Sequence, residues 1–169
     1  MPISTLQQLQ QFWTRLGERC PTPADFYLFG GSALLWLGAP RQTIDIDFSL
    51  QTSHPDAVRA VIAEVAAELN LDLEESNPAD FMPLPAGADQ RRQLIGQYGQ
   101  LSVYLFDPYS VALMKVDRAF DADMEDVQYL IQSGQVSMKQ LEQALEDVAR
   151  RYDEPRRLRR NFEALKRNL

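Results

Sequence analysis

The stretch that decides the fold is Gly30–Asp47, which reads G-G-S-A-L-L-W-L-G-A-P-R-Q-T-I-D-I-D. It follows a short, fully apolar run, Phe26–Phe29, that is typical of a buried strand. We expect Gly30 and Gly31 to form a tight turn into a helix, because glycine lets the backbone approach a ligand closely. The N–H groups at the start of that helix, together with the hydroxyl of Ser32, predict a phosphate-binding turn.

The same stretch ends in a predicted strand, where Asp45 and Asp47 are two residues apart and so lie on one face. Ile44, Ile46 and Phe48 alternate with them and are expected to form the buried face. Two neighbouring carboxylates repel each other unless a cation lies between them, and hard oxygen ligands beside a triphosphate favour Mg²⁺. Gly-Gly-Ser turns and Asp-x-Asp strands are each common alone. In this order, within eighteen residues, they predict a nucleotide and metal site.

This arrangement resembles the signature of the nucleotidyltransferase superfamily, in which a Gly-Ser helix is followed by an Asp-x-Asp strand. The details, G-G-S-A-L and then R-x-T-x-D-x-D, are most similar to the bacterial AbiEii-like (MenT-like) toxin nucleotidyltransferases and their short relatives. A later run, F-D-P-Y-S-V-A-L-M-K-V-D-R followed by D-M-E-D-V, resembles the second half of the same group. There a Lys-x-x-Arg helix precedes an acidic residue that opens another helix. The resemblance covers residues 26–134.

The resemblance implies that Gly31 and Ser32, with Gly30 beside them, hold the β- and γ-phosphates of an NTP. Arg41 and Thr43 would shape the turn or contact phosphate. The two aspartates would ligate Mg²⁺ and serve in catalysis.

In the second half, the resemblance implies that Lys115 and Arg118 neutralise the triphosphate, with Lys115 as a catalytic residue. Asp126 would orient the lysine or contact the base. The two cations are three residues apart and therefore share a helix face. The alternative is an exposed face on which they pair with nearby acids: Asp117, Asp121 or Glu125.

Many members of the superfamily use a third carboxylate, on a later strand, as the base that activates the attacking hydroxyl. The predicted strand 101–106 contains no acid. Asp107 directly precedes a proline, which favours a role as helix N-cap. Asp72 is a second candidate, but Glu74 and Glu75 beside it indicate an exposed edge strand. The sequence therefore leaves the general base open.

The pattern along the whole chain predicts an α+β protein: a nucleotidyltransferase fold with a small mixed sheet, flanking helices and a helical C-terminal half. We expect residues 1–107 to form the core and residues 108–169 the helical region. Helices are expected at 4–19, 33–37, 55–69, 109–119, 123–133, 137–149 and 155–168. Further strands are expected at 71–75, 92–95 and 101–106, with a long loop at 76–90. Trp13, Trp36 and Phe120 are expected to pack in the core or between helices.

Composition narrows the class of protein. Cys20 is the single cysteine, which excludes an intrachain disulfide and a cysteine-based zinc site and suits the cytoplasm. The start of the chain lacks the order of a signal peptide, and the apolar run at 33–39 is too short to span a membrane. The sequence thus predicts a cytoplasmic protein without membrane contact.

Charge is unevenly distributed. Residues 150–169 hold eight of the seventeen basic residues and three of the acidic ones, a net charge of +5, whereas residues 1–149 carry −12. A basic tail on an acidic body could attract a polyanion such as tRNA or another RNA. The alternative is a solvated face of a terminal helix.

Two functions compete at this level. One is an enzyme that transfers a nucleoside monophosphate from an NTP to a hydroxyl of RNA or protein, and the resemblance makes it the toxin of a toxin–antitoxin pair with an antitoxin protein as partner. The other is a non-catalytic module on the same fold that binds a nucleotide or a partner, an alternative favoured by the unassigned third acid.

Overall fold

The structure is a computed structural model that describes residues 2–3 and 5–169. It contains two compact units, of which the first comprises Met1–Asn77 and Gln93–Phe106 and the second Pro78–Arg92 and Asp107–Leu169. The sequence placed residues 78–92 in the first region, whereas the structure groups them with the helices. Two hydrogen bonds explain this, because Arg91 donates to the Asp107 carboxylate at 2.8 Å through both Nε and Nη2.

The first unit is built around a five-stranded mixed sheet with strand order β3-β2-β1-β5-β4. β1 runs antiparallel to β2 and parallel to β5, β2 runs parallel to β3, and β4 runs antiparallel to β5. The elements of this unit are α1 (Leu6–Arg19), β1 (Ala24–Phe29), α2 (Gly30–Trp36), β2 (Asp45–Thr52), α3 (Pro55–Leu69), β3 (Asp72–Glu75), β4 (Gln93–Tyr98) and β5 (Leu101–Leu105). The predicted α+β class and mixed sheet are confirmed.

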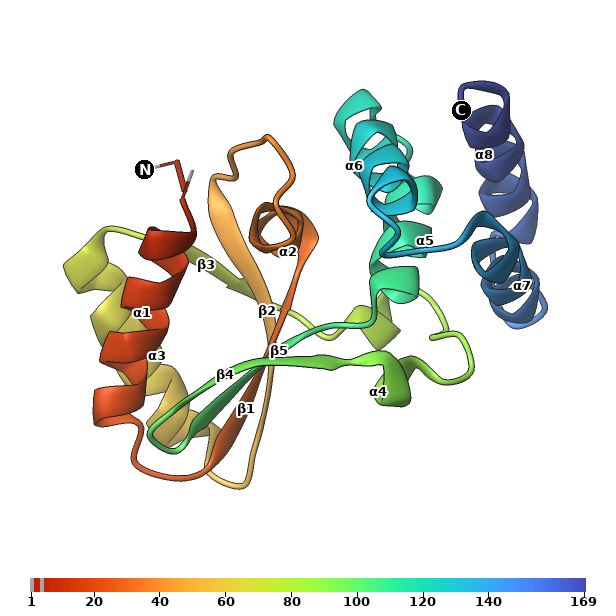
Figure 1. The fold of residues 1–169 in the computed structure, drawn as a ribbon. Coiled ribbons are helices and arrows are strands. Elements are labelled where there is room, and N and C mark those ends of the chain that lie inside the picture. Colours follow the sequence, from red (N-terminus) through yellow and green to blue (C-terminus); the bar gives the residue numbers. More distant parts are fainter. Residues whose placement is uncertain (1, 4) are drawn as a thin grey trace. The chain divides into compact units, whose positions relative to one another are not determined.

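One face of the sheet carries the core, because α1 and α3 pack side by side against it (Figure 1). Thr5 begins α1 with a capping box, in which its hydroxyl accepts from the N–H of Gln8. Trp13 is fully buried and meets the rings of Phe26 and Trp36 edge-on. The expected packing of Trp13 and Trp36 is thus confirmed. Asp45, Asp47 and Glu74 lie on the other face of the sheet.

The second unit is helical, as predicted, and α5 packs against α6, α7 and α8. α7 and α8 lie beside each other (Figure 1). The elements of the second unit are the 3₁₀ turn η1 (Pro78–Asp80), α4 (Ala88–Arg91), α5 (Pro108–Arg118), α6 (Asp121–Gln132), α7 (Met138–Ala149) and α8 (Pro155–Arg167). The predicted loop at 76–90 therefore contains one short 3₁₀ turn and the start of a short helix. Among the described residues, no helix is both long and apolar enough to cross a lipid bilayer.

Two apolar side chains were placed wrongly by the sequence. Ile44, expected on the buried face of β2, is 73% exposed, because it precedes the first residue of that strand. Phe120, expected in the core or a helix seam, is 65% exposed at the N-cap of α6. The Arg118 guanidinium lies over the Phe120 ring, 5.4 Å from its centroid, as in a cation–π contact.

Candidate functional site

Three carboxylates meet on one face of the sheet in the first unit. Asp45 and Asp47 project from β2 to the same side, and the parallel register of β3 places Glu74 opposite Asp47. One carboxylate oxygen of each of these three residues lies within 4.8 Å of the others. Mutual repulsion opposes such a group, and a divalent cation bound by hard oxygen ligands would relieve it.

Glu74 is the residue that sequence reasoning missed, since the acids at 72–75 were interpreted as an exposed edge. The edge is exposed, but alternation sends neighbouring side chains to opposite faces. Glu75 turns away from the aspartates and binds the Arg59 guanidinium at 2.8 Å. A signal existed in the spacing, because the D-x-E of β3 follows the D-x-D of β2 after one helix, and such a crossover joins parallel strands.

Gly30 lets Asp47 lie against the turn that leads from β1 into α2. Its φ of +65° is in the left-handed region that favours glycine. A Cβ atom at this position would lie 2.0 Å from Oδ2 of Asp47, which no real contact allows. The glycine turn and the aspartate strand are therefore in direct contact, as the sequence expected of one site.

Gly31, which has no Cβ atom, lets the segment after α2 lie close against the glycine turn. A Cβ atom there would lie 2.8 Å from Oγ1 of Thr43 and 2.9 Å from Nη2 of Arg41. The Thr43 hydroxyl donates to the carbonyl of Asp45 at 3.1 Å, which ties this segment to the start of β2. The structure thus brings Arg41 and Thr43 to the glycine turn, and Arg41 supplies a positive charge beside it.

Ser32 has a different environment from the one expected of a phosphate donor. The residue is fully buried, and its hydroxyl donates to the carbonyl of Phe29 at 3.1 Å. That bond fixes the first turn of α2. α2 is also only seven residues long, so its contribution as a helix dipole is small.

The N-terminus holds the Arg41–Thr43 segment in place. Ile3 and Thr43 form an isolated antiparallel bridge, with N–H···O distances of 2.7 and 3.0 Å. Ile3 is fully buried in the core of the first unit. The segment beside the glycine turn is therefore anchored from a part of the sequence that no motif indicated.

In the second unit, Lys115 lies buried between α5 and α6. Its ammonium donates to Oδ2 of Asp126 at 2.8 Å and lies 3.6 Å from Oδ1 of Asp123. Arg118 binds Asp123 through Nε and Nη2, at 2.8 and 2.6 Å, while its own side chain stays 60% exposed. Lys115 thus contacts Asp126, and Lys115 and Arg118 both lie beside Asp123. Asp123 is not among the acids that the alternative named as partners.

Two opposing effects set the pKa of Asp123, which lies beside Lys115 and Arg118. Burial by itself raises the pKa of Asp123. Hydrogen bonds from Arg118 and the N–H of Phe120, with the charges of Lys115 and Arg118, outweigh burial and hold that pKa below its ordinary value. Asp123 is therefore ionised at neutral pH, and its charge offsets part of the positive charge of Lys115 and Arg118.

Asp107 is an N-cap, as the sequence favoured. It is fully buried and begins α5 by accepting hydrogen bonds from the N–H groups of Tyr109 and Ser110, both at 3.1 Å. Its carboxylate also accepts from Arg91 and from the Ser110 hydroxyl. Because these hydrogen bonds occupy its oxygens, Asp107 has a structural role in the second unit.

Comparisons with known proteins agree with this geometry. The chain is similar in structure to an antigenic nucleotidyltransferase-like protein from Paracoccidioides brasiliensis, with a TM-score of 0.54 and 17% sequence identity. That similarity covers 97% of this chain and 95% of the other, and at this identity it shows the fold. A search of curated proteins found no match. Residues 4–168 match the model of a family described as "Nucleotidyltransferase of unknown function (DUF6036)". The chain, with its glycine turn and paired aspartates, therefore belongs to this nucleotidyltransferase family.

Proposed function

We propose that the protein transfers a nucleoside monophosphate from an NTP to a hydroxyl group of an acceptor, with Mg²⁺ bound by Asp45, Asp47 and Glu74. The observation that carries the proposal is the convergence of these three carboxylates beside the Gly30–Gly31 turn. Membership of a nucleotidyltransferase family supports it. The third carboxylate also removes the sequence-level reason for preferring a non-catalytic module.

The donor set suits a magnesium ion. Each of the three residues offers one carboxylate oxygen, and hard anionic oxygens are the ligands that Mg²⁺ prefers. When bound, the metal would neutralise the phosphate oxygens and the charge that develops on them. Arg41, beside Gly31, would add positive charge for the β- and γ-phosphates, and Thr43 would hold the turn that presents it.

In the reaction that we propose, the acceptor hydroxyl oxygen attacks the α-phosphorus of the NTP. A new oxygen–phosphorus bond forms while the bond between the α-phosphorus and the bridging oxygen to the β-phosphate breaks, so pyrophosphate leaves. The hydroxyl proton passes to a carboxylate. Glu74 is the best candidate for that base, because it is the most exposed member of the group and lies on the edge strand β3.

For Lys115, Arg118 and Asp126 we propose a role in binding phosphate groups, as the resemblance of the second motif implies. The buried Lys115 is fixed by Asp126 and can offer its remaining N–H groups, while the exposed Arg118 presents its charge to solvent. Asp126 is thus a positioning residue for the lysine. The proposed role of Lys115 and Arg118 is to neutralise phosphate charge.

For the acceptor we propose RNA, such as tRNA, bound through the basic tail. Five of the eight basic residues in 150–169 form ion pairs with acids on neighbouring elements or on their own helix. The other three make no ion pair within this fully described segment: Arg156, Arg160 and Arg167. On an α-helix these three lie within about 40° of one another, which forms one outward line of positive charge. Such a line suits a phosphate backbone.

A role as the toxin of a toxin–antitoxin pair remains the finer form of this proposal, and it rests on the AbiEii-like (MenT-like) resemblance of residues 26–134. Its test is induced expression in a bacterial host. Growth arrest that the D45N/D47N variant abolishes, and that co-expression of the neighbouring gene relieves, is the expected result.

The activity itself is tested by incubating the full chain with each of four α-³²P-labelled NTPs, Mg²⁺ and total RNA or soluble lysate protein. We expect label to enter RNA with wild type, and to be lost with Asp45→Asn and Asp47→Asn. Asp72→Asn is the matched control, because Asp72 lies on the same face of the sheet but outside the carboxylate group. If no acceptor is labelled while calorimetry shows tight NTP binding, the non-catalytic module is the correct function.

A further inference from the structure

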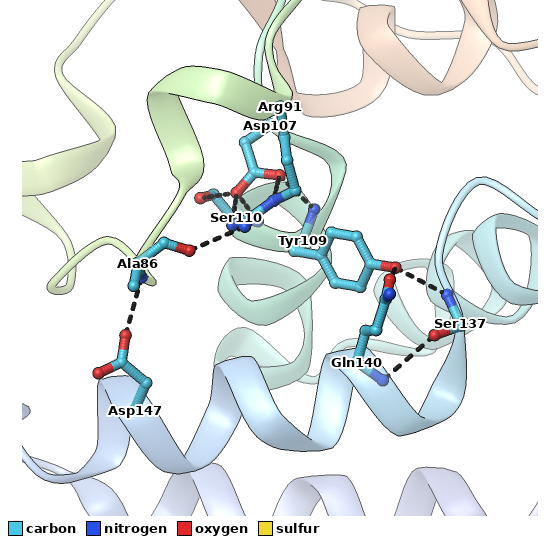
Figure 2. Close-up of polar contacts among 8 residues, drawn as sticks. All are labelled: Ala86, Arg91, Asp107, Tyr109, Ser110, Ser137, Gln140 and Asp147. Atoms are coloured by element: carbon cyan, nitrogen blue, oxygen red, sulfur yellow. Dashed lines mark hydrogen bonds and ion pairs between the residues drawn. The ribbon is translucent and has the colours of Figure 1, made fainter.

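A pocket of about 490 Å³ lies within the second unit, and Tyr109 of the second motif is among its lining residues. The segment 85–91 forms one wall, α7 forms the other, and Tyr109 of α5 lies between them (Figure 2). The lining residues are Pro85, Ala86, Arg91, Tyr109, Gln140, Gln143, Ala144, Asp147 and Arg150. The volume is in the range of pockets that hold a small ligand, of roughly 300–1,000 Å³.

One side of the pocket is a rigid flat layer. The Arg91 guanidinium lies 5.2 Å from the centroid of the Tyr109 ring. Three hydrogen bonds of 2.8 Å hold it there, two to the Asp107 carboxylate and one to the carbonyl of Ala86. Tyr109 is fixed in turn, because its hydroxyl donates to Gln140 and accepts from the N–H of Ser137 (Figure 2). A guanidinium held in one plane is a surface on which a nucleobase can stack.

In the described part of the chain, the opposite side of the pocket carries polar side-chain groups without hydrogen-bond partners. Among the described residues, the Gln143 amide has no hydrogen-bond partner, and Gln140 uses only the oxygen of its side-chain amide. Arg150 is 71% exposed at the pocket and has only a 3.6 Å contact with Asp147. A ligand with an uncharged polar edge and one negative charge would match these groups.

Asp147 limits the ligand further. Its Oδ2 accepts from the N–H of Ala86 at 2.8 Å and from Arg151 at 3.1 Å. The Ala86 hydrogen bond is the main cause that holds the pKa of Asp147 below its ordinary value, so this carboxylate is ionised at neutral pH. A negative group in the pocket disfavours a triphosphate, and its second oxygen can accept from the N–H groups of a base.

We propose that this pocket binds one nucleotide of a single-stranded RNA, with its base against the Arg91–Tyr109 layer. The edge of the base would bond to Gln140, Gln143 and Asp147. Arg150 would neutralise an adjacent phosphate. The inference rests on the proposed function in taking the acceptor to be RNA, and it gives that RNA a contact that reads a base, which the line of arginines on α8 does not.

The test is a binding measurement on the full chain with fluorescein-labelled pentamers of U, A, C and G, read by anisotropy without NTP or Mg²⁺. Ala144→Leu fills the pocket from α7 with a helix-compatible side chain. We expect it to weaken binding of the preferred pentamer about tenfold or more, in line with the loss of one stacked base. Ala63→Leu, at an exposed position of α3, is the matched control and should bind as wild type.

Gln143→Ala provides a second measurement that does not depend on the fold of the first variant, because the Gln143 amide is exposed and unpaired. It should weaken binding about fivefold and alter the order of preference among the four bases. If both variants bind all pentamers as wild type does, or if inorganic phosphate binds and pentamers do not, the inference is wrong.

Failure of this inference and failure of the proposed function can be told apart. Asp45→Asn/Asp47→Asn should lose label transfer and keep pentamer binding. Transfer to RNA that neither pocket variant alters would overturn the pocket and leave the enzyme standing. Pentamer binding that depends on Ala144 in a protein that labels nothing would overturn the enzyme and leave the pocket.

Discussion

Glu74 lies opposite Asp47 in the parallel register of β2 and β3, although 26 residues lie between them in the sequence. The helix α3 connects these strands, so one crossover completes the carboxylate group that the sequence left incomplete. Three carboxylates this close to one another repel each other in the metal-free protein. This relationship has direct consequences for metal binding and stability.

Substitution of Glu74 by Gln is expected to lower Mn²⁺ affinity at least tenfold and the transfer rate about a hundredfold, because it removes an anionic ligand and the proposed base. In EDTA the same variant should be slightly more stable than wild type, since one of three repelling charges is gone. Calorimetric titration with Mn²⁺ and thermal unfolding measure the two effects. Glu75→Gln is the control: this side chain binds Arg59 on the other face, and its substitution should leave metal affinity unchanged.

Gly30→Ala is expected to abolish nucleotide transfer and to cost about 1–3 kcal/mol of unfolding free energy, because the new Cβ would meet Asp47 and a positive φ disfavours alanine. Gly134→Ala supplies the comparison. Gly134 also has a positive φ, but a Cβ there meets no atom within 4 Å. Denaturant unfolding should show a cost in both variants, with loss of transfer confined to Gly30. Full transfer by a folded Gly30→Ala protein would contradict the role that we assign to this turn.

Asp126→Asn should destabilise the protein by about 3 kcal/mol, because it removes the negative charge that lies 2.8 Å from the buried Lys115 ammonium. Lys115→Met should abolish transfer, whereas the double variant Lys115→Met/Asp126→Asn should recover part of the lost stability. Urea unfolding of the four proteins completes the cycle. Additive effects would show that the two side chains do not interact.

Acid should weaken the second unit through Asp123. Its pKa in the folded protein is lower than in the unfolded chain, so the unfolded state takes up a proton first as the pH falls. The stabilisation is therefore complete above about pH 5 and is lost as the pH falls through about 4 towards the lower folded pKa. Asp123→Asn should be less stable at pH 7 by about 2 kcal/mol. Its unfolding free energy, measured in urea from pH 7 to 3, should fall less steeply than that of wild type.

Ile3→Ala should cost about 2–3 kcal/mol, since Ile3 is fully buried in the core of the first unit. The same change should raise the KM for NTP, because the bridge to Thr43 then holds the segment beside Gly31 less firmly. Leu6→Ala, at a side chain that is 41% exposed on α1, is a control for the N-terminal region. If the KM for NTP changes equally in both variants, the bridge between Ile3 and Thr43 has no specific effect on NTP binding.

Much of this architecture follows from local sequence. Alternation placed Asp45 and Asp47 on one face of β2, and the proline after Asp107 with a following helical pattern indicated the N-cap of α5. Periodicity also placed Trp13 in the core. Each of these depends on the next few residues along the chain, so each can be predicted without knowing the fold. Ile44 and Phe120 were misplaced because each lies just outside an element, where periodicity no longer decides which way a side chain points.

The sequence by itself determined the glycine turn, the aspartate pair and the Lys115–Arg118 helix face, because those depend on spacing within one element. Only the tertiary structure decided that Glu74 completes the carboxylate group, since strand pairing is a contact between distant segments. It also decided that Ser32 turns its hydroxyl to Phe29 and that Ile3 anchors Thr43. The physical reason is the same in each case: burial and register are fixed by the partner that a segment packs against, and that partner is not adjacent in the chain.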